Sequence, residues 1–186
     1  MEKKKLLLHT CCAPCSTHCV NELVKDYDTT MYFYNPNIHP YGEFVKRLEN
    51  LEKVADKHKI MIIEGSYDAE AWLEKVKGLE EQPEGGKRCK VCFTMRLTKT
   101  AECAKENGFD CFTTTLSVSP HKDAKLINEI GEELALRYGL EWVHSDFKKY
   151  GGFKKSTELS KEMGLYRQKY CGCFYSVNNN IASPKE

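Results

Sequence analysis

The stretch Lys5-Leu-Leu-Leu-His-Thr-Cys-Cys-Ala-Pro-Cys-Ser-Thr-His-Cys19 decides the fold of this chain. Its three consecutive leucines form a short apolar run, which predicts a buried strand. Four thiols follow this run closely, at Cys11, Cys12, Cys15 and Cys19. Ser16 and Thr17 favour the start of a helix, and Pro14 is tolerated in a first helical turn. The stretch therefore predicts a strand, a thiol-bearing loop and a helix.

Predicted strands and helices alternate along the rest of the chain. We expect further strands over 29–34, 59–65, 110–116 and 141–145, and helices over 16–26, 41–59, 69–77, 91–107 and 124–138. This alternation predicts a single α/β domain over 1–186, with a mostly parallel sheet of about five strands and helices on both faces. From residue 151 onward we expect loop and short helix, ending in an irregular Cys-bearing segment.

Composition narrows the class of protein. The chain of 186 residues is long enough to fold without disulfides. It has no apolar run of membrane-spanning length, and Met-Glu-Lys-Lys-Lys leads into only three leucines, so we predict a cytoplasmic protein with no membrane partner. In a reducing compartment, its ten cysteines favour metal binding or redox chemistry. The 28 basic and 27 acidic residues nearly cancel, but basic clusters at 3–5, 87–90 and 148–155 would suit phosphate contacts if they lie near the thiols.

Several polar residues follow predicted strands. Because ligands bind at the carboxyl ends of strands in an open α/β sheet, we predict substrate contacts at Asn35, Ser117 and Ser119. His121 is a candidate proton donor or phosphate contact. Tyrosines such as Tyr170 are numerous enough to suggest stacking on a flat base. The chain has no phosphate-loop or dinucleotide motif, so a nucleotide cofactor is not indicated.

Seven of the ten cysteines fall in three motifs, Cys11-Cys12-Ala-Pro-Cys15, Cys89-Lys-Val-Cys92 and Cys171-Gly-Cys173. A Cys-x-x-Cys spacing lets two thiolates reach one metal ion or cluster. Four thiolates would satisfy structural zinc, but seven exceed that number. An iron–sulfur cluster takes four and leaves others for a second metal or a dithiol pair. We expect Cys19, Cys103 and Cys111 to be small buried hydrophobic side chains.

Two other functions compete with an iron–sulfur enzyme. The motif Cys12-Ala-Pro-Cys15 between a strand and a helix has the form of a thioredoxin-type redox site. That fold is about half as long and needs no further cysteine motifs. A zinc-binding, tRNA-interacting protein is the second alternative.

Four motifs together resemble the QueH family of cobalamin-independent epoxyqueuosine reductases. They are the Cys-Cys-Ala-Pro-Cys loop, Arg88-Cys-x-x-Cys with Met95-Arg96-Leu97, Thr113-Thr-Thr-Leu-Ser-Val-Ser-Pro-His-Lys-Asp, and Tyr166-Arg-Gln-Lys-Tyr-Cys-Gly-Cys. The resemblance implies deoxygenation of an epoxide on a modified base of tRNA to an alkene, the last step of queuosine synthesis. It also implies a [4Fe-4S] cluster and a fold similar to the nucleotide-binding (HUP-like) fold of tRNA-thiolation enzymes.

The resemblance further implies roles for individual residues. Cluster ligands would be Cys11, Cys12, Cys89 and Cys92, with Cys171 and Cys173 as a redox-active pair and Cys15 as a candidate ligand of an additional mononuclear iron. Arg167 and Tyr170, in the last motif, are predicted substrate contacts. The implied partners are a queuosine-family tRNA, bound through its anticodon arm, and an external electron donor.

Overall fold

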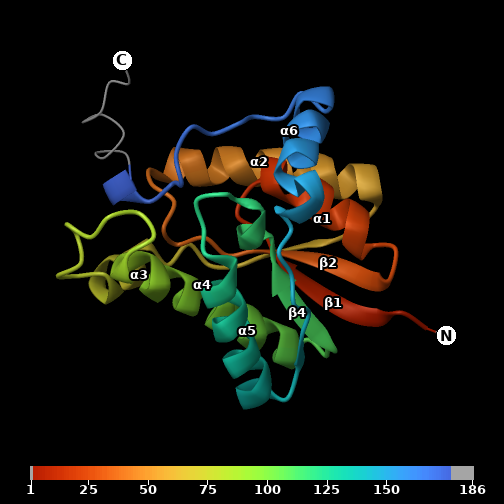
Figure 1. The fold of residues 1–186 in the computed structure, drawn as a ribbon, viewed down its shortest axis with the longest axis horizontal. Helices are drawn as coiled ribbons and strands as arrows, with labels where there is room; N and C mark the ends of the chain where they lie inside the picture. The colour runs from red at the N-terminus through yellow and green to blue at the C-terminus, as the bar shows by residue number, and fades with distance from the viewer. Residues whose placement is uncertain (1, 177–186) are drawn as a thin grey trace.

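A computed structural model describes residues 2–176, and these form an α/β structure around one five-stranded sheet (Figure 1). The strands are β1 (Lys4–His9), β2 (Tyr27–Phe33), β3 (Ile62–Glu64), β4 (Cys111–Thr114) and β5 (Glu141–Trp142). Their order is β3-β2-β1-β4-β5, and every pair of neighbours is parallel. The predicted α/β fold with a five-stranded parallel sheet is confirmed. Its likeness to the fold of tRNA-thiolation enzymes stays a prediction.

Helices cover both faces of the sheet, as Figure 1 shows. One face carries α1 (Ala13–Leu23), α2 (Tyr41–His58) and α6 (Gly152–Glu162), and the other carries α3 (Ala69–Lys75), α4 (Lys87–Glu106) and α5 (Ala124–Tyr138). Two short 3-10 turns, η1 (Thr115–Val118) and η2 (Lys149–Gly151), complete the described elements. Within residues 2–176, no helix is long and apolar enough to cross a bilayer.

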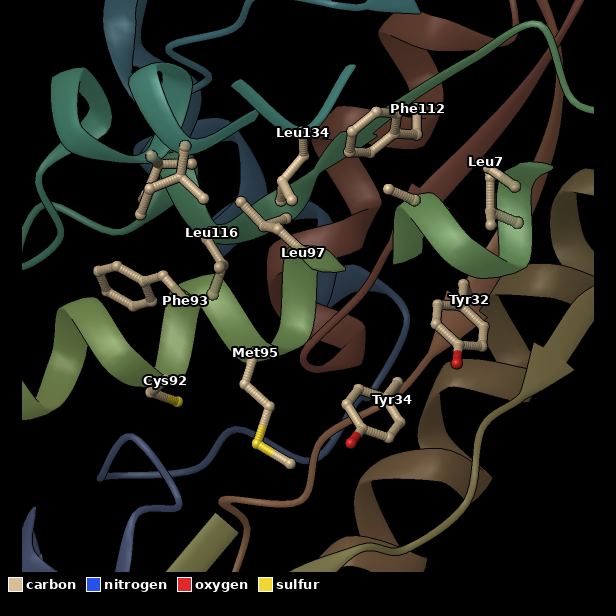
Figure 2. Close-up of a cluster of buried hydrophobic side chains, with 14 of the residues drawn as sticks. Leu7, Tyr32, Tyr34, Cys92, Phe93, Met95, Leu97, Phe112, Leu116 and Leu134 are labelled. Carbon is tan, nitrogen blue, oxygen red and sulfur yellow. The ribbon is translucent and has the colours of Figure 1, made fainter. Parts of the chain in front are cut away.

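Alternation along β1 divides the core between these two layers. Leu6 and Leu8 point to the α1 and α2 side, whereas Leu7 joins Phe93, Leu97 and other side chains on the α4 and α5 side (Figure 2). All three leucines are fully buried, so the run Leu6–Leu8 is hydrophobic on both sides, as strands in a covered parallel sheet are. Removing any of them would cost about 2–5 kcal/mol, because the cavity left behind cannot close fully.

The order of the strands fixes where a ligand can bind. From β1 the chain moves outward through β2 to β3, and it then returns to place β4 on the other side of β1. The loops that follow β1 and β4 therefore diverge to opposite faces, which opens a crevice at the carboxyl ends of these two strands. The first thiol loop and η1 lie at this point.

Helix starts differ from the prediction at two sites. The first helix begins at Ala13 and the fourth at Lys87, earlier than the predicted 16 and 91. Cys12 occupies the N-cap of α1, while the Ser16 and Thr17 hydroxyls donate to the carbonyls of Ala13 and Pro14 inside the first turns. These earlier starts were not predicted, because neither N-cap residue, Cys12 or Gly86, makes a side-chain capping hydrogen bond.

This shift places thiols on helices. Cys15 lies in the first turn of α1 and Cys89 in the first turn of α4, both outside the predicted helices, and Cys92 follows in the second turn of α4. Strand β4 also ends early, at Thr114, because the Thr114 side chain accepts a hydrogen bond from Leu116 N and starts η1. The predicted irregular tail is present over 163–176, and its last residues, 177–186, lie outside the described part.

Candidate metal centre

The first group of thiols, here called the N-terminal triad, consists of Cys11, Cys12 and Cys15. Their three sulfurs lie within 4.8 Å of one another, and the sulfurs of Cys11 and Cys12 are 3.8 Å apart. Two of these residues come from the loop after β1 and the third from the first turn of α1. A tetrahedral site with metal–sulfur bonds of about 2.3 Å separates its sulfurs by about 3.8 Å, the spacing that Cys11 and Cys12 already have, so the triad is a candidate metal site.

Electrostatics favour one thiolate in the triad. Hydrogen bonds from Cys12 and Cys15, followed by the charges of Arg96 and Lys122, hold the pKa of Cys11 well below its usual range. Donation of a hydrogen bond to Cys11 raises the pKa of Cys12 to about 12, and donation to both neighbours raises the pKa of Cys15. A thiolate is the form that binds metal. The apo triad is therefore poised with its negative charge on Cys11.

The second and third groups share one cavity. Cys89 and Cys92, the helix pair, and Cys171 and Cys173, the tail pair, all line a small cavity of about 30 Å³. Burial raises the pKa of Cys92, and it raises that of Cys173 to about 11. All ten cysteines are free thiols. Six of the seven cysteines in motifs thus line two neighbouring cavities at the crevice, and Cys12, which is fully buried, lines neither.

The two spaces adjoin through shared residues. A larger cavity of about 420 Å³ is lined by Cys11, Cys15 and also Cys171. Arg96, His121 and Lys122 line both cavities as well. A volume of this size is within the range of small-molecule sites. Cys171 is therefore the tail thiol that faces both spaces, whereas Cys173 lines the smaller one only.

Arg96 lies between the triad and the helix pair. It is 1% exposed, its Nη2 donates to Asn35 Oδ1 at 2.6 Å and its Nε donates to His9 Nε2 at 3.3 Å. Burial, followed by this guanidinium, lowers the pKa of His9 to about 3, so His9 is neutral. The Arg96 charge acts on both Cys11 and Cys92. A buried cation with neutral partners is costly, and an anionic centre held by these thiols would offset that cost.

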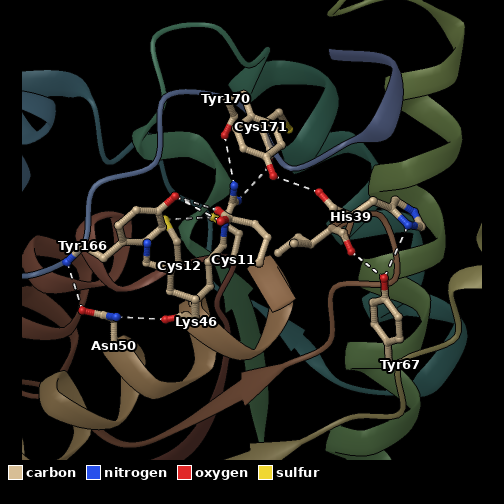
Figure 3. Close-up of polar contacts among 12 residues, drawn as sticks. Cys11, Cys12, His39, Lys46, Asn50, Tyr67, Tyr166, Tyr170 and Cys171 are labelled. Carbon is tan, nitrogen blue, oxygen red and sulfur yellow. Dashed lines mark hydrogen bonds and ion pairs between the residues drawn. The ribbon is translucent and has the colours of Figure 1, made fainter. Parts of the chain in front are cut away.

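A second buried arginine, Arg47, holds the backbone of Tyr170 and Cys171, the two tail residues that Figure 3 labels beside His39. Arg47 is 2% exposed, pairs with Glu43 at 2.7 Å, and donates to the carbonyl oxygens of Cys171 at 2.9 Å and Tyr170 at 3.2 Å. The Tyr170 hydroxyl donates to His39 O at 2.8 Å. These contacts hold the backbone of the tail against the start of α2.

Gly172 permits the close approach. Its φ is +105°, and a Cβ there would lie 2.9 Å from Ile38 Cγ1 and 3.0 Å from Arg47 Nη1. The neighbouring backbone also pairs, since His39 N donates to Gly172 O at 2.9 Å and Ile38 forms a bridge with Cys173. A side chain at position 172 would displace the tail pair.

The predicted substrate contacts fall into two sets. Ser119, His121, Arg167 and Tyr170 line the larger cavity, so the structure brings them together beside Cys11 and Cys171. Asn35 and Ser117 are fully buried and are absent from that lining. Asn35 donates to Thr10 O and accepts from Arg96, and Ser117 lies 3.3 Å from Ser145 Oγ. Their position is that of support beneath the site, and their role as substrate contacts stays a prediction.

Sequence reasoning assigned no role to Arg47, Arg96 and Lys122. A signal for Arg47 was available, because it follows Phe44 by three residues and precedes Leu51 by four, which puts it on the apolar face of α2. Burial opposes the charge of Lys122, but the thiols of Cys171, Cys11 and Cys15 raise its pKa. The site therefore carries more positive charge than the motifs alone indicated.

Comparison with known proteins identifies the family. The family model described as epoxyqueuosine reductase QueH matches residues 6–179. This chain belongs to the epoxyqueuosine reductase QueH family. Among proteins of that name, it is 41% identical to that of Streptococcus pyogenes over 94% of this chain and 71% of the relative. It is 38% identical to that of Thermotoga maritima over 92% of this chain and 90% of the relative. The predicted membership and the predicted oxidoreductase class are confirmed.

The residues at the site fit the iron–sulfur centre that the resemblance to this family implies. Sulfurs of a cluster and its cysteines accept hydrogen bonds from buried N–H groups. Trp72 Nε1 and Arg88 Nε are buried, have no hydrogen-bond partner among the described residues, and belong to residues that line the smaller cavity. Burial raises the pKa of Cys92, and the charge of Arg96 acts against it. Donors and cations therefore surround thiols, the environment that an anionic metal–sulfur centre requires.

Proposed function

We propose that this chain is an epoxyqueuosine reductase, which converts the epoxide of epoxyqueuosine in tRNA into the alkene of queuosine. Family membership supports this function. The observation that carries it is the convergence of three cysteine motifs on two adjoining cavities at the carboxyl ends of β1 and β4. The family favours it over a thioredoxin-like exchange protein or a zinc-binding protein.

The tail pair can supply the two electrons and two protons that the reaction requires. Removing the epoxide oxygen as water, to leave a carbon–carbon double bond, takes two electrons and two protons. Oxidation of the Cys171 and Cys173 thiols to a disulfide releases two electrons and two protons, so the balance closes. An external donor then returns two electrons to the disulfide. Cys171 would be the thiol nearer the substrate, because it alone of the pair lines the larger cavity.

We propose Cys11, Cys12, Cys89 and Cys92 as the ligands of a [4Fe-4S] cluster, with Cys15 available to an additional iron. Support comes from the charge of Arg96. This charge acts to lower the pKa of Cys11 in the triad and of Cys92 in the helix pair, so it favours thiolates in both groups. When bound, a cluster supplies single electrons. The protein's own contribution is positive charge, because Arg96 and Lys122 favour the thiolate of Cys11 and Arg96 also favours that of Cys92.

The larger cavity would bind the modified base. His121 lies on its lining together with Cys171, and it would give a proton to the departing oxygen. Ser119 fixes the loop that carries His121, because its Oγ accepts from His121 N at 3.3 Å. Arg167 and Tyr170, on the opposite segment of the lining, offer a cation and an aromatic face to the nucleotide.

The test compares substrates of increasing size. Anaerobically prepared protein is supplied with a reductant and with epoxyqueuosine as free nucleoside, as an anticodon stem-loop, or in whole tRNA. Products are digested and measured by mass spectrometry. We expect queuosine from tRNA and from the stem-loop, and much slower turnover of the nucleoside, because backbone phosphates supply most of the affinity. Equal turnover of the nucleoside would contradict the tRNA substrate, and absence of queuosine from all three would contradict the function.

A further inference from the structure

We propose that the basic-aromatic segment, residues 148–155, binds single-stranded RNA at the mouth of the larger cavity, with Tyr150 stacked on an unpaired base. Its sequence is Lys-Lys-Tyr-Gly-Gly-Phe-Lys-Lys. The inference rests on the proposed function, since it names the part of the protein that receives the anticodon loop. It concerns a surface next to the cavity and no residue of the metal centre.

Tyr150 is displayed to solvent at the cost of backbone strain. Its side chain is 96% exposed, and its φ of +51° lies in the left-handed region that residues other than glycine rarely adopt. The next residue, Gly151, also has a positive φ. A strained residue that persists points to function, because the same turn could be made with glycine at lower energy. An exposed aromatic ring is what a sequence-tolerant RNA site requires.

The base of the segment is fixed to the elements that carry the site. Gly152 is buried, and a Cβ there would lie 1.7 Å from Phe147 O and 2.9 Å from His18 Cδ2 of α1. Ser117 Oγ of η1 accepts from Phe147 N at 3.4 Å, and Thr17 Oγ1 of α1 donates to Ser156 O at 3.4 Å. The segment thus packs between α1, which carries Cys15, and η1. Its position relative to the thiols is set by backbone contacts.

The segment continues into the larger cavity. Phe153, 44% exposed, lines that cavity together with Cys11 and Cys15, as do Ser156 and Thr157 of α6. Tyr150 precedes Phe153 by three residues. A base seated in the cavity and its neighbour along the strand could therefore meet two aromatic side chains in succession, the arrangement found where proteins bind single strands by stacking.

Charge favours a polyanion as the partner. Four lysines flank the aromatic residues, and the segment contains no acidic residue. Lys148 and Lys149 share Asp146 at 2.9 and 3.9 Å, Lys154 approaches Glu158 at 3.9 Å, and Lys155 forms no ion pair among the described residues. The cavity lining adds five cations, Arg47, Arg96, Lys122, Arg167 and Lys169, against Glu84. Basic and aromatic residues also suit anionic lipid surfaces, but the continuity with this cationic cavity favours RNA.

The decisive variant is Tyr150→Gly. Glycine is favoured at this φ, so the variant should unfold at the same temperature as the wild type or higher, and a loss of binding cannot then come from misfolding. We expect its dissociation constant for a fluorescent queuosine-family anticodon stem-loop to rise about 5- to 150-fold, the effect of losing one stacked base. Tyr150→Phe keeps the ring and should bind as the wild type does. Met61→Ala, at a 69% exposed residue near the amino end of β3, is the matched control.

A second comparison tests the lysines by the salt dependence of the affinity for RNA. The double variant Lys149→Ala/Lys155→Ala should lower the slope of log affinity against log salt by about 1.4, the effect of two phosphate contacts on a single strand. Lys53→Ala/Lys57→Ala, on the exposed side of α2, should leave the slope unchanged.

The outcomes separate this inference from the proposed function. If wild-type protein binds the stem-loop and forms queuosine but Tyr150→Gly binds equally well, the inference is overturned and the function stands. If the segment variants lose binding to phosphatidylglycerol vesicles and keep RNA affinity, the surface is a lipid contact and the inference is wrong. If wild-type protein neither binds the stem-loop nor converts it, both fail.

Discussion

The N-terminal triad and the tail pair bring thiols to the same crevice by different means. The triad comes from five consecutive residues at a strand end and a helix start, and its sulfurs lie within 4.8 Å without help from distant segments. The tail pair lies more than 150 residues later and is held by Arg47, by the 38–39 backbone and by the conformation of Gly172. Local structure therefore positions the N-terminal triad, whereas contacts with distant segments position the tail pair. Changes to docking should disable the tail pair while the metal stays.

The largest effect is expected from removing a cluster ligand. Cys12→Ser and Cys92→Ser should each abolish both the brown colour and reductase activity, because a hydroxyl is a poor substitute for a thiolate ligand of iron. Cys103→Ser, at a partly buried α4 cysteine outside the motifs, is the control and should keep both. Ultraviolet–visible spectra and queuosine formation measure the two properties. A brown, active Cys92→Ser protein would refute this ligand set.

The second-largest effect is expected from removing one thiol of the tail pair. We expect Cys171→Ala and Cys173→Ala to keep the visible absorbance and bind tRNA but to form no queuosine, because either change removes half of the dithiol. Iron content and tRNA affinity are measured alongside activity. Loss of iron in either variant would show that the pair supplies metal ligands. Full activity in either would show that it takes no part in the reaction.

A smaller effect should follow from disturbing the docking alone. Gly172→Ala forces a side chain to a φ of +105° against Ile38 and Arg47, so we expect a loss of about 1–3 kcal/mol in unfolding free energy, reduced activity and unchanged iron. Gly164→Ala is the control, because Gly164 has a φ of +60° and nothing within 4 Å of a Cβ. It should show strain without loss of activity. If both variants keep full activity, docking of the tail is not what positions Cys171.

The smallest change is in thiol reactivity of the metal-free protein. Since the pKa of Cys11 is held well below its usual range of about 8.5, its thiolate persists as pH falls below that value, and its alkylation rate should fall much less than that of an ordinary cysteine. Burial raises the pKa of Cys103, so its rate should fall about tenfold per pH unit. Iodoacetamide labelling followed by peptide mass spectrometry measures both. A tenfold fall per unit at Cys11 would contradict the thiolate assigned to it.

The fold was predictable where local signals were strong. The predicted helix over 124–138 matches α5 at both ends, because Asp123 caps its start and Gly139, at a φ of +66°, ends it. The start of α4 was predicted four residues late, since Gly86 caps it without a side-chain hydrogen bond and no apolar period begins until after Lys87. The sequence thus places Cys11 and Cys12 correctly at the carboxyl end of a strand, but not Cys15 and Cys89 on the helices that orient them.

The site was predictable in its thiols and less so in its charges. Cysteine spacing exposes metal-binding motifs directly, whereas Arg47 and Arg96 lie on helices where charged residues are usually assigned to solvent. For Asn35 and Ser117, the position in the fold was predictable but the depth of burial was not. Topology put them at the right strand ends, but burial depth depends on packing by Arg96 and Ser145, which no local pattern reveals.

The central claim is that Cys11, Cys12, Cys89 and Cys92 hold one iron–sulfur cluster, with the tail pair beside it. Its most direct test is iron, zinc and acid-labile sulfide analysis of protein purified without oxygen, together with its visible spectrum. We expect about four irons and four sulfides per chain with broad brown absorbance, or about five irons if Cys15 helps to hold another. Stoichiometric zinc without sulfide, in colourless protein, would contradict it.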